Sequence, residues 1–263
     1  MKIFILFVLP LLLLSKVHYA KVEPYQSVIL KSAVSGLITN VNLDLEGKIV
    51  TSERVIHIDD KLDLLNLNDS KQNIILLNDM FKLNKDIAAT LKNAMQRQEE
   101  YYKRISKLST ASKTQKDNAY SAFSSAKTQY LSTKEKIISL QKQILDMEFK
   151  VSQLNDTISK KSVVLKDKYL YELLVSVGDF VAPGTPIARV NDTSRAKLVL
   201  FLEAEELEEL AYKSIYFDGN KTEYKVDKVW KVADEKYISS YRAEIYIPAP
   251  KDIFSKLIKI EIK

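Results

Sequence analysis

Residues 48–177 form a run of 130 positions without glycine or proline, although the chain has five glycines and six prolines in total. In the interior of a helix glycine costs about 1 kcal/mol and proline about 3 kcal/mol relative to alanine, and both residues mark turns. So long a run without them predicts long helices. The glycines and prolines on either side of the run predict short strands joined by tight turns.

Two heptad patterns fill this run, with apolar residues at alternating spacings of three and four. The first pattern has its predicted seam at Leu77, Met80, Asn84, Ile87, Leu91, Ala94, Gln98, Tyr101, Ile105 and Leu108. The second has its seam at Ala119, Phe123, Ala126, Tyr130, Thr133, Ile137, Leu140, Ile144, Met147, Val151, Leu154 and Ile158. We interpret Met80, Met95, Met147, Phe123 and Tyr130 as core, and the polar seam residues Asn84 and Gln98 as tuning the register.

The polar segment STASKTQ (109–115) separates the two patterns. A short connector between helices of similar length makes them antiparallel neighbours. With about 40 residues in each helix and about 1.5 Å per residue, the two helices should form a coiled-coil hairpin roughly 60 Å long. Its tip, at about residues 106–115, should be exposed to solvent.

The N-terminal segment is typical of a secretory signal. It carries Lys2, an apolar run at residues 3–14 and a polar stretch that ends in Ala20. We therefore expect a signal peptide at residues 1–20 and a periplasmic protein, with an uncleaved anchor as the alternative because His18 is large for its position. The chain has no cysteine, which excludes disulfides and thiolate metal sites. Its net charge of +6 is spread along helical faces, so we expect no nucleic-acid partner.

Two β segments flank the helical run and resemble each other. SGLITNVNLDLEGKIVTSERVIHID (35–59) and ELLVSVGDFVAPGTPIARV (172–190) both alternate apolar residues before a glycine turn. Counted from Gly47 and Gly178, Val50 matches Val181 and Ile56 matches Ile187. The predicted structural turns of the two halves are Gly36, Gly47, Gly178 and Gly184, and Glu53 stands where the second copy has Gly184.

These two segments resemble the halves of a biotinyl/lipoyl-like flattened β-sandwich. A helical hairpin between such halves is similar to the pattern of the periplasmic adaptor proteins, or HlyD-type membrane fusion proteins. The resemblance implies an elongated α+β fold in which an antiparallel coiled-coil hairpin is inserted in a split lipoyl-like β-sandwich and a small β-barrel follows. It places the halves at residues 21–62 and 163–192, the hairpin at 63–162 and the barrel at 193–263, with one helix at 203–211. We expect the family's further membrane-proximal domain to be absent.

The expected tip carries a second resemblance. In adaptors that meet an outer-membrane channel tip to tip, an Arg, a Leu four residues later and a Ser at the start of the returning helix form the contact. RISKLSTASKTQKDNA supplies Arg104, Leu108 and Ser112, with a connecting loop shorter than the family's common form. The alternative is that Leu108 ends the seam, Ser112 caps the second helix and Arg104 is solvated.

The resemblance implies a non-catalytic subunit that bridges an inner-membrane transporter, of the resistance-nodulation-division or the ATP-driven type, to an outer-membrane channel in a tripartite pump. It also implies self-association into a ring, commonly of six protomers. The sequence has no HExxH, Cys-His pair, phosphate-binding glycine loop or serine elbow, so we expect no enzyme activity, cofactor or metal site. The alternatives are a structural coiled-coil envelope protein and a lipoyl or biotinyl carrier, which would need a modifiable lysine at the turn between the halves.

Overall fold

The computed structural model describes residues 16–208, 210–251 and 254–263, and the chain divides into two compact units. The second unit is the continuous segment Ile58–Ser162. The first unit combines the segment before it, up to His57, with the segment after it, from Val163 to the C-terminus. The structure therefore confirms an α+β fold in which a helical unit is inserted into a β unit.

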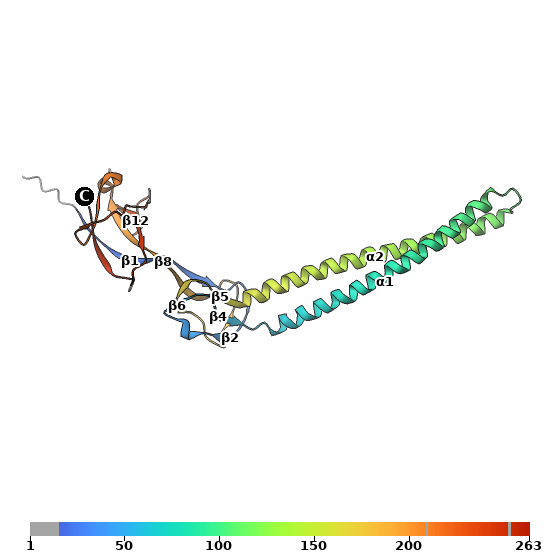
Figure 1. The fold of residues 1–263 in the computed structure, drawn as a ribbon, viewed down its shortest axis with the longest axis horizontal. Helices are drawn as coiled ribbons and strands as arrows, with labels where there is room; N and C mark the ends of the chain where they lie inside the picture. Colours follow the sequence, from blue (N-terminus) through green and yellow to red (C-terminus); the bar gives the residue numbers. More distant parts are fainter. Residues whose placement is uncertain (1–15, 209, 252–253) are drawn as a thin grey trace, which may run out of the picture. The chain divides into compact units, whose positions relative to one another are not determined.

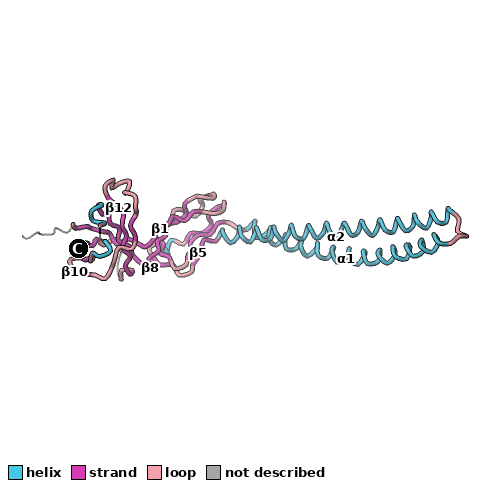
Figure 2. The backbone as a smooth tube through the Cα atoms, turned by 90° about the horizontal axis from the view of Figure 1, so that it is seen from above, coloured by secondary structure: helices cyan, strands magenta, loops and turns pink. Residues whose placement is uncertain are grey.

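The helical unit is a hairpin of two long helices, α1 (Lys61–Lys107) and α2 (Lys113–Lys161). The two helices run antiparallel and side by side (Figures 1 and 2). They contain 47 and 49 residues, so each is about 70 Å long at about 1.5 Å per residue. The connector is residues 108–112, which is shorter than the predicted tip segment.

The seam of α2 is the predicted one. Ala119 and Leu140 are buried, and every other predicted α2 seam position is partly buried, while the residues between them are mostly exposed. Near the open end of the hairpin, Lys161 forms an ion pair with Asp63 and donates a hydrogen bond of 2.6 Å to the carbonyl oxygen of Asp59.

The seam of α1 corrects the prediction at four positions. Leu77, Asn84, Leu91, Gln98 and Ile105 face α2 as expected, and Asn84 is buried with its amide donating to the Met80 carbonyl oxygen. Met80, Ile87, Tyr101 and Leu108, however, are more than 40% exposed. The next residues, Phe81, Ala88 and Tyr102, are buried or partly buried in their place, and Ala94 and Met95 are both partly buried.

Thirteen strands are present in the described part of the chain. The strands that precede the hairpin are β1 (Val17–Lys31), β2 (Gly36–Val41), β3 (Lys48–Val50) and β4 (Glu53–Ile58), with a 3-10 turn η1 (Leu43–Leu45). Those that follow it are β5 (Ser162–Leu165), β6 (Lys168–Leu173), β7 (Phe180–Val181), β8 (Pro186–Glu203), β9 (Ile215–Phe217), β10 (Asn220–Lys221), β11 (Lys228–Val229), β12 (Ser240–Pro248) and β13 (Leu257–Ile262). They form a nine-stranded sheet and a four-stranded sheet, β5-β4-β2-β7. The nine-stranded sheet follows the path β10-β9-β13-β1-β8-β12-β11, and β6 joins it at β8 and carries β3.

The two predicted lipoyl-like halves pair with each other strand by strand. Gly36 in β2 lies opposite Val181 in β7, and β3 pairs with β6. The amide of Gly47 donates to the carbonyl oxygen of Leu170, and the amide of Gly178 donates to that of Ile38, both at 2.9 Å. The two turn glycines, far apart in sequence, thus lie in the same β unit.

The internal repeat is visible in burial. The matched pairs Val50 and Val181, and Ile56 and Ile187, are all at most 2% exposed. The turn at Gly184 has no counterpart at Glu53, the equivalent position of the first half. Gly184 has φ of 92°, a conformation that glycine adopts readily, whereas Glu53 is simply the first residue of β4. The second half therefore makes a glycine turn where the first half begins a strand.

One continuous strand runs from the second lipoyl-like half into the predicted barrel. The predicted boundary at residue 192 falls inside β8, an 18-residue strand that pairs with β1 on both sides of that position. The register of β1 shifts between Pro24 and Gln26, at a proline that has no amide to donate. At this point the Arg195 guanidinium lies 4.0 Å from the centre of the Tyr25 ring. The strands β1 and β8 thus belong to both parts.

The region predicted as a barrel, which we call the barrel part, has its own core. This core is made by Val22, Leu198, Leu200, Leu202, Ile215, Ala243, Ile245 and Ile260 together with Ala20 and Ala196. The predicted helix at 203–211 is two shorter pieces, α3 (Ala204–Leu207) and η2 (Leu210–Tyr212). Glu203 and Glu206 form a capping box at the start of α3.

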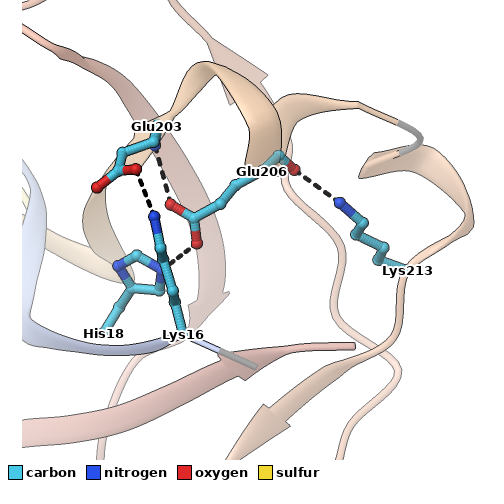
Figure 3. A network of polar contacts seen from close by, with 5 residues as sticks. All are labelled: Lys16, His18, Glu203, Glu206 and Lys213. Carbon is cyan, nitrogen blue, oxygen red and sulfur yellow. Dashed lines mark hydrogen bonds and ion pairs between the residues drawn. The ribbon is translucent and has the colours of Figure 1, made fainter. Parts of the chain in front are cut away.

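The expected signal peptide at residues 1–20 lies mostly outside the described residues, and its last residues, from Val17, belong to β1. Val17 to Lys21 of β1 pair with Glu261 to Leu257 of β13. Ala20 is 1% exposed in the barrel core. Figure 3 shows two further contacts at the N-terminal end of β1: Lys16 forms an ion pair with Glu203, and His18 Nε2 lies 2.6 Å from Glu206 Oε1. A cut at residue 20 would remove one end of a sheet strand.

Candidate functional site at the hairpin tip

The tip of the hairpin is a five-residue turn with an ordered entry and exit. α1 ends at Lys107, and Leu108 leaves the helix with an extended backbone (φ −77°, ψ 121°) while its amide still donates to the Ile105 carbonyl oxygen at 3.2 Å. The Leu108 side chain is 49% exposed. The turn therefore directs a large apolar side chain partly into solvent instead of into the seam.

Ser112 is the N-cap of α2. Its hydroxyl accepts a hydrogen bond from the Gln115 amide at 3.2 Å, and the Gln115 side-chain oxygen accepts one from the Ser112 amide at 2.9 Å. This reciprocal capping box satisfies two amides at the helix start. The serine hydroxyl keeps its own hydrogen available for donation, because it serves the cap only as an acceptor.

Arg104 lies in the last turn of α1, four residues before Leu108, and is exposed. A cation in the last turn of a helix interacts favourably with the helix dipole. The three residues of the predicted contact are thus all exposed and all lie at or beside the turn. The structure also gives Ser112 the capping role of the alternative interpretation, and the two roles are compatible.

An aromatic cluster that the sequence reading did not single out lies directly behind the tip. The Tyr102 ring is 5.4 Å from the Tyr120 ring and is stacked with the Phe123 ring at 6.2 Å. Such pairs contribute about 0.5–1.5 kcal/mol beyond their buried area. The signal was present in the sequence as three aromatic residues on both sides of the connector, but the predicted seam used Tyr101 in place of Tyr102. The cluster holds the two helices together where the turn begins.

The strongest electrostatic effects lie in the β unit. Hydrogen bonds from Lys168 and Ser194 hold the pKa of Asp192 well below its usual range. Burial opposes ionisation of Glu244, but hydrogen bonds from Arg242 and Tyr246 outweigh it and lower the pKa of that carboxyl. The pair of Lys168 and Asp192 joins β6 to β8. Arg242, Glu244 and Tyr246 all lie in β12, and Glu244 is linked to β8 by a contact of 3.8 Å with Lys197.

Among residues 16–208, 210–251 and 254–263, no group of three or more His, Cys, Asp or Glu side chains is arranged to hold a metal ion. A search of the same residues finds no helix with the length and apolar character needed to cross a membrane. His57 lies in β4, where its carbonyl oxygen accepts a hydrogen bond from Thr39.

A helical hairpin inserted into a split β domain, with two strands continuing into a second β region, is the fold of the membrane fusion proteins, or periplasmic adaptors. The crystal structure of MacA from Actinobacillus actinomycetemcomitans superposes with a TM-score of 0.73 at 17% identity, over 95% of this chain and 78% of that one. The membrane fusion protein Spr0693 from Streptococcus pneumoniae R6 gives 0.59 at 10% identity, over 95% of this chain and 99% of that one.

A MacA-MexA chimera that carries the Pseudomonas aeruginosa MexA α-hairpin gives a TM-score of 0.61 at 16% identity, over 95% of this chain and 78% of that one. No family model and no curated protein sequence matches the chain. At these identities the likeness defines the fold.

Proposed function

We propose that the protein is a periplasmic adaptor subunit that connects an inner-membrane transporter to an outer-membrane channel, without catalysing a reaction itself. The observation that carries this proposal is the inserted hairpin, whose turn presents Arg104, Leu108 and Ser112 to solvent. A structural envelope protein would need the coiled coil but not the split β unit. A lipoyl carrier would need a lysine at the turn between the halves, and here the hairpin takes that place.

The chemistry of the turn suits the tip of a partner helix hairpin. Leu108 offers apolar area, and burial of such area is worth about 25 cal/mol per Å². Arg104 and the Ser112 hydroxyl can donate hydrogen bonds to carbonyl or carboxylate oxygens on the partner. Because the capping box and the aromatic cluster fix the turn beforehand, little ordering cost remains for binding.

The β unit would supply the other end of the adaptor. In this proposal the barrel part contacts the transporter, and several copies of the chain form a ring around the conduit. Either a resistance-nodulation-division or an ATP-driven transporter fits this role. The proposed mechanism is mechanical: changes in the transporter would reach the hairpin through the segments 59–64 and 160–166, which connect it to the β unit.

Site-specific photo-crosslinking in the native host tests the tip. A photo-reactive amino acid at position 108 should form an adduct with an outer-membrane channel protein, identified by mass spectrometry, and Arg104→Glu should reduce its yield at least tenfold. The matched control is Lys136→Glu, which reverses an exposed charge in the middle of α2 and should leave the yield unchanged. If position 108 forms no channel adduct in the unmodified background, or if Arg104→Glu leaves the yield intact, the tip does not make this contact.

A further inference from the structure

One outer side of the barrel part is rich in lysine. It is formed by the first residues of β1 and by β13, β9 and β10, which pair in that order. Residues that stand opposite each other in an antiparallel pair project from the same side of the sheet. The residues that share the outer side in this way, directly or two positions along a strand, include Tyr19, Lys21, Lys221, Leu257, Lys259 and Lys263. We call these six residues the basic face.

The other side of the same strands is the core of the barrel part. Side chains alternate between the two sides of a strand. His18 points toward Glu206 at α3 (Figure 3), and Ala20 lies in the core. Tyr19, between them, therefore projects away from the core and is 69% exposed, and Leu257 on β13 is 64% exposed. The basic face is thus a surface and not part of the packing between strands.

The basic face has an excess of positive charge. Glu261 lies on the same side but is only 8% exposed, because the ammonium groups of Lys259 and Lys263 both pair with its carboxylate. The Lys263 ammonium also lies 5.0 Å from the centre of the Tyr216 ring. At the edge of the face, the Asp218 carboxylate accepts a hydrogen bond from the Lys259 amide at 3.1 Å. The four lysines therefore outnumber the carboxylates beside them.

Two of the four lysines are available to a partner. Lys21 and Lys221 are exposed, and within residues 16–208, 210–251 and 254–263 neither has an ion-pair partner. The next outward residue of β1, Glu23, stands opposite Lys197 on β8. The charge of Lys21 is therefore not balanced along its own strand, and a partner with negative charge would meet hydrated, unpaired ammonium groups.

Large apolar and aromatic side chains stand beside these lysines. Tyr19 is opposite Lys259, Lys21 is opposite Leu257, and Val17 at the start of β1 is 43% exposed. Tyrosine is enriched where lipid headgroups meet hydrocarbon, and lysine keeps its ammonium in water while its stem lies along apolar surface. An acidic protein would use the lysines alone. The combination with exposed apolar side chains fits an anionic lipid surface better.

The sequence just before the basic face favours the same partner. Residues 3–14 are an apolar run, and β1 begins at Val17. Three residues span at most about 10 Å. A bilayer that takes up the run would therefore lie within about 10 Å of the start of the basic face.

We propose that the basic face binds an anionic lipid bilayer, with Lys21 and Lys221 at the headgroup phosphates and Tyr19 and Leu257 at the boundary with the hydrocarbon. The inference goes beyond the proposed function, in which the barrel part contacts a transporter, because it assigns one side of the barrel part to lipid. Since the attraction is electrostatic, it should weaken as salt is added.

Sedimentation with vesicles tests the charge. The full-length chain is mixed with vesicles of phosphatidylcholine alone or with about 30% phosphatidylglycerol, which makes the surface negative. Binding to the anionic vesicles should be at least tenfold stronger, and Lys21→Glu combined with Lys221→Glu should reduce it at least tenfold. The matched control combines Lys31→Glu with Lys166→Glu, two exposed lysines of the lipoyl-like halves, and should change binding less than twofold.

A fluorescent probe tests which side of the barrel part meets lipid. Because the natural sequence has no cysteine, an environment-sensitive probe is attached to Leu257→Cys or to Ile238→Cys. Ile238 is 85% exposed and lies between β11 and β12, which are separated from β13 in the sheet by β1 and β8. Anionic vesicles should shift the emission to the blue at position 257 and leave it unchanged at 238. Position 257 is far in sequence from residues 3–14, so the apolar run alone does not explain a shift there.

Three outcomes would overturn the inference: equal binding to neutral and anionic vesicles, equal loss of binding for the two pairs of lysine variants, or a blue shift at position 238 as large as that at 257. The melting temperature of each variant should match that of the unmodified protein, because all four lysines are exposed. The vesicles contain neither a transporter nor a channel. A failed vesicle test therefore leaves the tip contact to its own photo-crosslinking test, and a failed tip contact leaves the basic face unaffected.

Discussion

Asp63 in the first turn of α1 forms an ion pair with Lys161, the last residue of α2, and the two side chains are only 22% and 12% exposed. Lys161 also donates to the Asp59 carbonyl oxygen, just before α1 begins. The start of α1 and the end of α2 are thus joined by the ammonium group of Lys161, which is largely removed from solvent. Breaking a shielded pair leaves the remaining charge without its partner, which is more costly than loss of an exposed pair.

Lys161→Met should therefore destabilise the hairpin by about 1–3 kcal/mol, because Asp63 keeps its charge at a largely buried position and loses its ion-pair partner. Chemical denaturation followed by far-UV circular dichroism measures this, since the long helices dominate that signal. Lys160→Met is the matched control: Lys160 pairs with Asp156 at an exposed site, where loss of the pair should cost at most about 0.5 kcal/mol. Equal effects of the two substitutions would contradict the assigned role of Lys161.

The seam itself predicts a sharp difference between neighbouring leucines of α2. Leu140 is 3% exposed and Leu145 is 59% exposed. Leu140→Ala should cost about 2–4 kcal/mol, because it removes buried apolar area and leaves a cavity. Leu145→Ala should cost less than about 1 kcal/mol in the dilute monomer. The measurement is again the denaturation midpoint by circular dichroism, and similar losses for both variants would mean that α2 faces α1 differently.

The α1 seam shows how far a sequence pattern can decide packing. At four predicted seam positions the next residue is also apolar or aromatic, which gives the pairs Met80 and Phe81, Ile87 and Ala88, Ala94 and Met95, and Tyr101 and Tyr102. Either member of each pair keeps the heptad spacing, so periodicity alone allows both seams. The structure places Phe81, Ala88, Met95 and Tyr102 toward α2. On α2 the residues after four seam positions are also aromatic or aliphatic, namely Tyr120, Leu131, Ile138 and Leu145, but they are exposed and the predicted seam is confirmed.

The β unit was predictable where local signals were strong. Glycine turns and alternating apolar residues located both lipoyl-like halves, and their pairing follows because an antiparallel hairpin returns the chain to its start. The extent of β1 and β8 was not predictable in the same way. A strand's continuation through residue 192, or its beginning at Val17, depends on partners such as Glu261 that are distant in sequence. Local rules for signal cleavage contain no information on that pairing.

Acid should weaken the β unit through Glu261. Hydrogen bonds from Lys259 and Lys263 lower the pKa of Glu261 from 4.5 to about 2. A carboxyl whose pKa is lowered by folding contributes stability that is fully present above 4.5 and is lost as the pH falls through about 2. Glu261→Gln should therefore lower the melting temperature at neutral pH and flatten its dependence on pH in this window. The fluorescence of Trp230, the single tryptophan, reports on the β unit.

Glu235→Gln is the control for that measurement, because Glu235 is exposed and its removal should leave the pH dependence intact. If Glu261→Gln follows the unmodified protein between pH 4.5 and 2, then the ion pairs with Lys259 and Lys263 do not stabilise the fold.

The first residues of β1 predict that the chain is not cut between Ala20 and Lys21 in the folded protein. Ala20 is 1% exposed, and the pairing of Val17 to Lys21 with β13 supplies one neighbour of that strand. The intact mass and N-terminal sequence of protein isolated from its host should therefore include Lys16 to Ala20.

Ala20→Asp, which places a charge in the core of the barrel part, should destabilise the β unit by about 2–4 kcal/mol. Lys21→Asp, at an exposed neighbouring position, should cost less than about 1 kcal/mol. Isolation of a stable chain that begins at Lys21, with an unchanged melting temperature, would show that this end of β1 is dispensable.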